Sequence, residues 1–245
     1  FDLISFFPAV VSHSLYPVFA SLMAQGAKDE LRLRFQRYLK IMWALAIPVG
    51  IGGSLLAKPI IIILAGKEYV EAAPVLAILV WAPAALFVYI TANSLVISQL
   101  TKFAVVITGV NVAINLIGNL LLLPRIGIRG AAIMTVASEF LQGLFYLWFV
   151  RKKIMDFYFF RYIIRPFVAS IIMGTILYWS GLTVGYSEFS SEIALIQRVL
   201  LTAAVGGVIY ALSLLAMGFL DSDDYKLLDK LIVRLRLKTN SNNGQ

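Results

Sequence analysis

The sequence predicts an all-α fold, a polytopic membrane helix bundle with about seven transmembrane helices. Of its 245 residues, 60% are hydrophobic and only 14% are charged, and the mean hydropathy is +0.88. A soluble domain is about 45–50% apolar and about 25% charged, so this chain has too few polar residues to cover a surface in water. Its apolar residues gather in runs of about 20, the length of a helix that crosses the roughly 30 Å hydrocarbon core of a bilayer.

The expected spans are separated by short segments that carry most of the charge. We expect them at about 1–24, 41–64, 74–98, 103–123, 130–150, 166–183 and 195–220. Residues 221–245 begin with Asp and Ser, which are good helix caps, and predict a cytoplasmic amphipathic helix followed by a disordered polar tail. The first residue is not Met and lies inside an apolar run, so we expect a fragment of a longer protein that begins part-way through a span.

Residues 25–40 differ in character from the spans on either side of them. Leu31, Phe35 and Leu39 share one helical face, and basic residues occupy the other. This pattern predicts an amphipathic helix that lies on the membrane surface.

Lysine and arginine are distributed unevenly between the connecting segments. If residues 25–40 and the C-terminus are cytoplasmic, 16 of the 21 basic residues lie on the cytoplasmic side and 5 on the other side. An excess of Lys and Arg in short loops marks the cytoplasmic side of a membrane protein. We therefore predict a multi-pass protein of the cell (plasma or inner) membrane, with a cytoplasmic C-terminus and with residues 65–73 outside.

The fourth expected span carries three asparagines at helical spacing. Asn111, Asn115 and Asn119 are four residues apart and form one stripe. The stripe either bonds a neighbouring helix, which contributes about 0.6 kcal/mol per residue pair, or lines a cavity that binds sugar hydroxyls.

The fifth span carries a carboxyl group near its middle, at Glu139, with Gln142 one turn later. A carboxylate at that depth costs about 2.5–3.5 kcal/mol and faces a cavity or a partner in most membrane proteins. Glu139 is either a proton or Na+ site that couples transport to an ion gradient, or a structural group bonded to one of the asparagines. Asn93 and His13 are further pathway candidates, although a lone His is more often a packing residue.

Basic residues next to the spans are candidates for contact with anionic head groups or with a lipid diphosphate. Each cation near an anionic membrane surface contributes about 1 kcal/mol to binding, and both Arg and Lys pair well with phosphate. The candidates are Arg32, Arg37, Lys40, Arg151, Lys152 and Lys153.

The composition argues against several other classes of protein. The chain has no Cys and one His, so it predicts neither a thiolate nucleophile nor a zinc site. No phosphate-binding loop is present, and the basic clusters are typical of membrane orientation, so we expect no enzyme activity, no cofactor, no metal and no nucleic acid partner. Asp221, Asp223 and Asp224 suggest a membrane glycosyltransferase as an alternative, but helix capping explains them better.

Three segments in order carry a resemblance to a known family. They are YPVFASLMAQGAKDELRLRFQRYLK at 16–40, GKEYVEAAPVLAILVWA at 66–82 and NVAINLIGNLLLLPRIGIRGAAIMTVASE at 111–139. The sequence resembles the C-terminal half of the Wzx-like polysaccharide flippases, within the multidrug/oligosaccharidyl-lipid/polysaccharide exporter superfamily. The resemblance implies one lobe of an inverted-V transporter of about 12–14 helices, with the N-terminal half of the same protein as its partner.

The resemblance implies a flippase function. Such a protein translocates a polyprenyl-diphosphate-linked oligosaccharide for surface polysaccharide or lipopolysaccharide biosynthesis, by alternating access about a midplane cavity. A cation-coupled multidrug exporter and a lipid II flippase are alternatives within the same superfamily. A membrane-embedded glycosyltransferase is the alternative from a different class.

Overall fold

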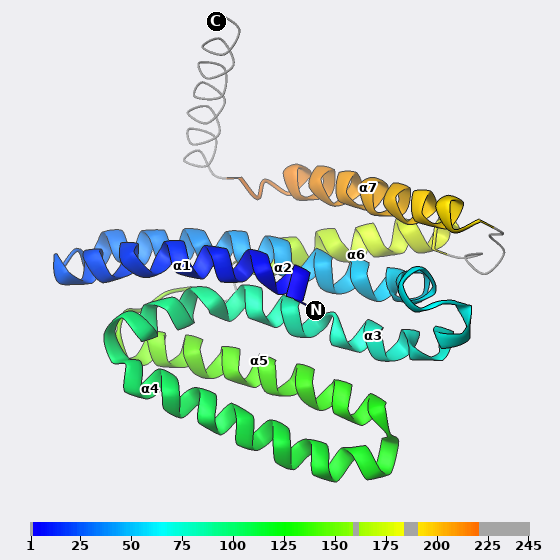
Figure 1. Ribbon diagram of the computed structural model, residues 1–245. Coiled ribbons are helices and arrows are strands. Elements are labelled where there is room, and N and C mark those ends of the chain that lie inside the picture. Colours follow the sequence, from blue (N-terminus) through cyan, green and yellow to red (C-terminus); the bar gives the residue numbers. More distant parts are fainter. Residues whose placement is uncertain (1, 159–161, 184–190, 221–245) are drawn as a thin grey trace, which may run out of the picture.

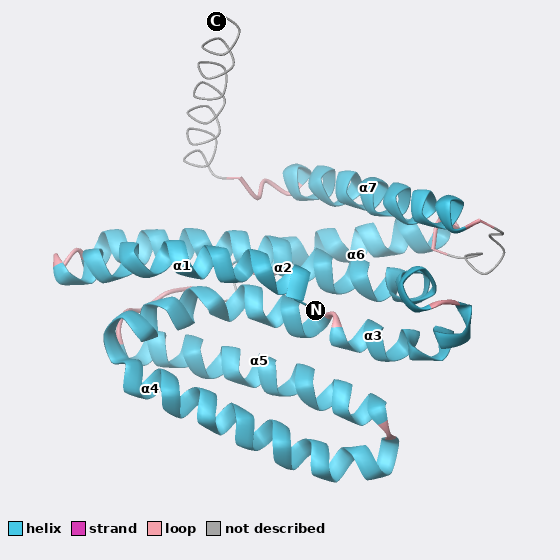
Figure 2. Ribbon diagram, viewed as in Figure 1, coloured by secondary structure: helices cyan, strands magenta, loops and turns pink. Residues whose placement is uncertain are grey.

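The computed structural model describes residues 2–158, 162–183 and 191–220. Almost all of these residues are helical (Figures 1 and 2). Its helices are α1 (Asp2–Ala24), α2 (Lys28–Ala65), the 3₁₀ helix η1 (Lys67–Ala72), α3 (Ala73–Leu79), α4 (Trp81–Ile126), α5 (Ile128–Lys153), α6 (Ile164–Trp179) and α7 (Glu192–Ala216). The predicted all-α bundle is confirmed. The surface helix and tail expected at 221–245 lie outside the described residues.

Five helical stretches are long and apolar enough to cross a membrane. They are Lys28–Ala65, Lys67–Ser98, Thr101–Ile126, Ile128–Lys153 and Glu192–Ala216. Two shorter apolar helices, Ser14–Ala24 and Ile164–Trp179, accompany them. Two of the long stretches meet inside α4, where Figure 1 shows the chain reversing direction. We call residues 81–98 the first half of α4 and residues 101–126 its second half.

Helix α2 lies in the middle of the bundle. In Figure 1, α6 and α7 lie on one side of it, and α4 and α5 lie on the other. Contacts of α2 with α6 and α7, and with α3 and α4, agree with this view. The bundle therefore has two flanks, an α4–α5 hairpin and an α6–α7 pair, on a common central helix.

The surface helix predicted at residues 25–40 is not a separate element. Residues 28–65 form one continuous helix, and no Gly or Pro between Lys28 and Pro48 interrupts it at the expected boundary near residue 40. Its expected lipid-facing side is in the protein interior, where Phe35 is fully buried with its ring centroid 5.0 Å from that of Phe157. The helix is amphipathic as expected, but its apolar face packs against protein.

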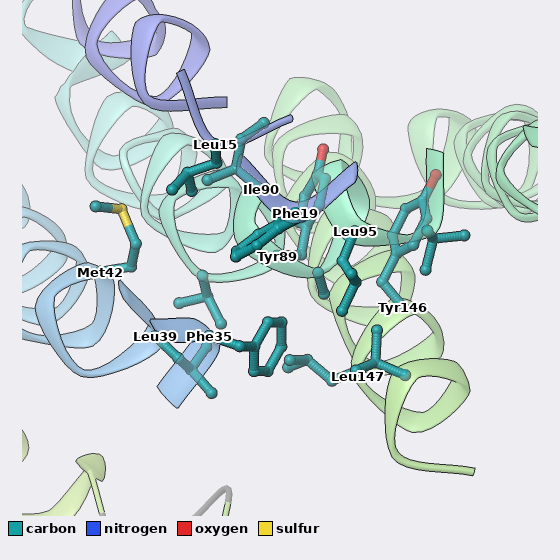
Figure 3. Close-up of a cluster of buried hydrophobic side chains, with 14 of the residues drawn as sticks. Leu15, Phe19, Phe35, Leu39, Met42, Tyr89, Ile90, Leu95, Tyr146 and Leu147 are labelled. Atoms are coloured by element: carbon teal, nitrogen blue, oxygen red, sulfur yellow. The ribbon is translucent and has the colours of Figure 1, made fainter. Parts of the chain in front are cut away.

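The largest buried cluster joins α1, α2, α4 and α5 (Figure 3). The rings of Phe19 and Phe35 lie 6.3 Å apart at its centre, and Leu95 from the first half of α4 is fully buried beside them. Lipid is as apolar as these side chains, so close packing, rather than escape from water, holds such a cluster together. Tyr89 and Tyr146 form the edge of the cluster that faces the hairpin (Figure 3).

The break between α3 and α4 is held by a short stretch of α2. A Cβ atom at Gly50 would lie 2.7 Å from the Trp81 ring, so only glycine admits the ring there. The Trp81 indole N–H donates to Ser54 Oγ at 3.1 Å, and this oxygen lies 2.8 Å from the Ala77 carbonyl oxygen. The same Ser54 oxygen lies 2.8 Å from the Gly50 carbonyl oxygen, so its single hydrogen is shared between its own helix and a carbonyl close to where the next helix is interrupted.

Candidate functional site

The second half of α4 and α5 form a tight hairpin. Gly127, with φ of +64°, makes the turn and donates its N–H to the Leu123 carbonyl, while Pro124 lies inside the last turn of α4. Gly118 packs directly against Met134, leaving no room for a Cβ atom. Small residues at such positions let helix backbones approach closely, which brings short polar side chains within hydrogen-bonding reach of each other.

The asparagine stripe faces α5 across this hairpin. Asn111 Nδ2 donates to Gln142 Oε1 at 2.6 Å, and Asn115 Nδ2 donates to Ser138 Oγ at 2.9 Å. Asn119 Nδ2 extends the row by donating to Asn115 Oδ1 at 2.9 Å. We call these five side chains the polar ladder.

The polar ladder continues beyond Gln142 toward the core. Gln142 Nε2 lies 3.5 Å from Thr108 Oγ1, which lies 3.4 Å from the Tyr146 hydroxyl. That hydroxyl is also 3.4 Å from the Ala104 carbonyl oxygen. These distances are at the long end for hydrogen bonds, so this end of the row is weakly bonded compared with the asparagine end.

Glu139 has a partner of its own outside the polar ladder. The Tyr89 hydroxyl, from the first half of α4, donates to Glu139 Oε2 at 2.9 Å. The Tyr89 ring stacks on that of Tyr146, with centroids 5.8 Å apart and planes inclined by 11°. Gly143 allows this approach, since a Cβ atom there would lie 3.3 Å from Tyr89. The bond between Glu139 and an asparagine, one of the two expected arrangements, is not formed.

Unused hydrogen-bonding capacity remains in this region. The Oδ1 atoms of Asn111 and Asn119 are buried acceptors without a partner in the described residues. Within the same part of the chain, no Lys or Arg forms a salt bridge with Glu139, and no cluster of three potential metal-ligating side chains occurs. A buried unpaired acceptor costs free energy, so these oxygens suit an incoming hydroxyl, water or cation.

Asn93 lies apart from the polar ladder but next to its weak end. It lines a groove of about 580 Å³ between the two halves of α4, together with Thr108 and Tyr146. The other lining residues are Ile97, Thr101, Ala104, Val105, Gly109 and Val112. The groove therefore places Asn93 beside Thr108 and Tyr146, at the end of the polar row that includes Gln142. The side chain of His13 lies outside the described residues.

The basic candidates on α5 are exposed and lie in its last helical turn. Arg151 Nε contacts Asp156 Oδ1 at 3.2 Å, and Lys152 Nζ lies 4.9 Å from the centre of the Trp148 ring. Lys153 ends the helix. Cations are favoured at a helix C-terminus, and a Trp beside a Lys is typical of the membrane–water interface.

The basic candidates on α2 are less uniform. Arg32 and Arg37 are partly exposed, and the Arg32 guanidinium carbon lies 6.0 Å from the centre of the Tyr158 ring. Lys40 is only 6% exposed, with Nζ 4.7 Å from the centre of the Phe219 ring. Its position near Phe219 favours packing in the protein over contact with a lipid phosphate.

Four polar side chains in this region were not among the candidates chosen from sequence. They are Tyr89, Thr108, Ser138 and Tyr146. Helical spacing could have predicted two of them. Thr108 precedes Asn111 by about one turn, and Tyr146 follows Gln142 by one turn, so each shares a helical face with a candidate residue. Tyr89 gave no such signal, because it meets Glu139 only through the reversal inside α4.

These features define a class of protein, a polytopic membrane helix bundle with paired polar side chains within its spans, as membrane transporters have. The sequence matches the family described as "Lipid II flippase MurJ" over residues 3–204, and the chain belongs to that family. The exporter superfamily expected from the sequence is thereby supported. The branch that matches is the lipid II alternative, and not the Wzx-like branch that the resemblance placed first.

Individual relatives agree with the family match. An uncharacterised membrane protein of Methanocaldococcus jannaschii is 27% identical over 214 residues, which cover 85% of this chain and 39% of the relative. The lipid II flippase MurJ of Bacillus subtilis is 28% identical over 219 residues, covering 84% of this chain and 40% of the relative. The chain therefore spans about two fifths of the length of these relatives.

A solved structure shows the same fold. The lipid II flippase MurJ in its inward closed conformation superposes with a TM-score of 0.65 at 17% sequence identity. The match covers 85% of this chain and 43% of that one. The helices described above thus correspond in fold to about two fifths of that structure.

Proposed function

We propose that this chain is part of a flippase that moves a lipid-linked cell-wall precursor of the lipid II type across the membrane. The observation that carries the proposal is the family match over residues 3–204, joined to a hairpin whose spans hold paired amides and a carboxyl group. Two buried asparagine acceptors in this hairpin, on Asn111 and Asn119, have no partner in the described residues. A hydroxyl-rich or amide-rich head group supplies the donors that those acceptors lack.

The proposed mechanism is alternating access. The polar ladder and Glu139 provide hydrogen bonds that replace water around the head group during transfer, while the prenyl tail stays in the hydrocarbon. The tight glycine contacts and the buried cluster shared with α1 and α2 hold the hairpin in place, so these helices move together against the rest of the transporter.

Complementation by the full-length protein tests the proposal. It is expressed in a bacterium whose own lipid II flippase is depleted, and growth and peptidoglycan incorporation are measured. We expect rescue by the unaltered protein and loss of rescue by Asn111→Leu, with equal amounts of both proteins in the membrane. A failure of the unaltered, membrane-inserted protein to rescue growth would contradict the proposal.

A surface oligosaccharide linked to polyprenyl diphosphate is the second candidate substrate, because residues 111–139 resemble the Wzx-like branch even though the family match over residues 3–204 is to the lipid II branch. The same protein is tested in a strain that lacks its surface polysaccharide flippase. Restored surface polysaccharide without rescue of lipid II flipping would assign this substrate instead.

Ion coupling through Glu139 is part of the proposal. Proteoliposomes with an imposed proton or Na+ gradient, containing the full-length protein, would show which gradient accelerates flipping of a labelled lipid. We expect acceleration by one gradient, and its loss in Glu139→Gln. Equal flipping with and without both gradients would remove the coupling role.

The proposed orientation in the cell membrane places residues 65–73 outside and the C-terminus in the cytoplasm. The chain has no cysteine, so single cysteines at Lys67 and Lys152, in a Cys-free full-length background, give a direct test. An impermeant thiol reagent should label the first in intact cells and the second only after permeabilisation. The reverse pattern would invert the topology.

A further inference from the structure

The groove between the two halves of α4 has the shape of a lateral binding site. Val105 and Val112 form its outer edge and are 65% and 60% exposed, whereas Tyr146, which is 1% exposed, closes its floor. An added Cβ at Gly109 would meet nothing within 4 Å, so the groove stays open along this turn of the helix. Its volume of about 580 Å³ is within the usual range for ligand sites.

The groove lies between membrane-spanning stretches, so a lipid is the ligand that can reach it most directly. Its lining belongs to Lys67–Ser98 and Thr101–Ile126, with Tyr146 from Ile128–Lys153, and all three stretches are long and apolar enough to span a membrane. The groove lies close to the α4 reversal: Asn93 is five residues before Ser98, or about 8 Å along the helix. Because its outer edge is exposed in a spanning segment, a chain lying in the bilayer reaches it without passing through water.

The polar lining selects for more than a simple hydrocarbon chain. The Asn93 amide forms no hydrogen bond with the described residues, whereas Thr101 Oγ1 bonds the Ile97 carbonyl at 3.1 Å. Lys102 does not line the groove, but it follows the lining residue Thr101 at the reversal and is exposed. An occupant that satisfies the amide and the cation carries an acceptor-rich, anionic neck directly after an apolar chain, as a prenyl diphosphate ester does.

We infer that this groove binds the polyprenyl diphosphate carrier of the substrate, with the first isoprene units against Val105 and Val112 and the diphosphate neck between Asn93 and Lys102. The inference rests on the proposed flippase function and names where that function holds the carrier. It also links the carrier to the carboxyl group. An occupant that touches Tyr146 touches the ring stacked on Tyr89, whose hydroxyl bonds Glu139.

Photo-crosslinking in the full-length protein tests this site. A photoreactive phenylalanine analogue replaces Val105, or Leu120 as a matched control that is 68% exposed on the same helix and does not line the groove. The probe is a labelled polyprenyl-diphosphate sugar in vesicles of phosphatidylglycerol and phosphatidylethanolamine. We expect about fivefold more labelling at position 105, roughly the selectivity that one neutral hydrogen bond supplies.

Competition separates the carrier from ordinary lipid. Unlabelled polyprenyl diphosphate should abolish the labelling at position 105, and added phosphatidylglycerol should not. Equal labelling at positions 105 and 120, or equal competition by phosphatidylglycerol, would overturn the inference.

A filled groove provides a second test. Gly109→Leu places a side chain where the structure has open space, so the protein should fold, and Gly207→Leu, also in open space on α7, is its control. We expect Gly109→Leu to lower crosslinking at position 105 and to slow flipping about fivefold, with Gly207→Leu unchanged. Normal flipping by the unaltered protein with no crosslink refutes the groove alone, whereas absence of flipping by the unaltered protein refutes the proposed function.

Discussion

The two flanks of the central helix α2 use polar side chains in different ways. In the α4–α5 hairpin, Asn111, Asn115 and Glu139 each bond another side chain. In the α6–α7 pair, polar side chains bond backbone carbonyl oxygens. There, Arg198 donates to the Gly181 carbonyl at 3.2 Å. The Thr202 hydroxyl lies 2.8 Å from the Arg198 carbonyl oxygen in its own helix and 3.3 Å from that of Leu182.

This difference distinguishes hydrogen bonds that hold a helix in place from hydrogen bonds that build a specific polar site. A backbone carbonyl is available at every residue, so bonds such as that from Tyr210 to the Ala44 carbonyl fix a helix without requiring a particular partner side chain. A bond between two side chains needs both residues at one level of two helices. The α4–α5 hairpin therefore has a more specific polar arrangement than packing requires, and we expect function to be concentrated there.

Replacing the carboxyl group should produce the largest difference between the flanks. Glu139→Gln removes the ionisable group that bonds the Tyr89 hydroxyl and that is proposed to couple flipping to an ion gradient, so flipping by the full-length protein should fall about tenfold or more, a change of about 1.4 kcal/mol in the barrier. The matched variant Tyr210→Phe, which removes a hydroxyl bonded to a backbone carbonyl, should flip at the normal rate. Equal flipping rates for both variants would contradict the expectation that function is concentrated in the α4–α5 hairpin.

Crowding the hairpin tests its rigidity. Gly118→Ala places a Cβ atom into Met134 and should destabilise the protein by about 1–3 kcal/mol, seen as a lower unfolding temperature in detergent. Gly207→Ala on α7 meets open space and should be neutral or slightly stabilising, because Ala is the better helix former. An unchanged unfolding temperature for Gly118→Ala would show that Met134 moves aside easily.

A double-mutant cycle sharpens the contrast further. Asn115→Ala and Ser138→Ala, singly and together, should show a coupling free energy of about 0.6 kcal/mol in unfolding measurements, typical of a hydrogen bond between membrane helices. The Thr202 side chain bonds no other side chain, so Thr202→Val should show no coupling with Asn115→Ala. Additive effects of Asn115→Ala and Ser138→Ala would mean that their bond adds no specificity.

The smallest effect is expected away from both flanks. Arg34 and Glu30 pair at 2.6 Å on α2 with side chains 46% and 49% exposed. Since exposed pairs one helical turn apart contribute about 0.3–0.5 kcal/mol, Glu30→Gln should barely change stability and should leave flipping intact. A larger loss of stability or of flipping would indicate that the Arg34–Glu30 pair has a structural or functional role beyond an exposed ion pair.

The sequence predicted most of the residues of the candidate site, but it did not predict which of them form hydrogen bonds with each other. Spacing alone placed the three asparagines on one stripe and set Glu139 and Gln142 near the middle of the next span. Nothing in the sequence said that Asn115 bonds Ser138 while Glu139 bonds Tyr89, because Tyr89 is 50 residues from Glu139 in the chain. The sequence also separated residues 25–40 from the following span, although helix α2 continues through both.

By itself, the sequence determined the membrane class, the helical fold and the hairpin that carries the polar residues. These follow from composition and from spacing along one helix, which are local properties of the chain. Only the tertiary structure decided which polar groups pair, that the amphipathic face of α2 packs inside the bundle, and that Asn93, Thr108 and Tyr146 line one groove. These depend on the reversal inside α4 and on the approach permitted by Gly118 and Gly143, which set distances between residues far apart in sequence.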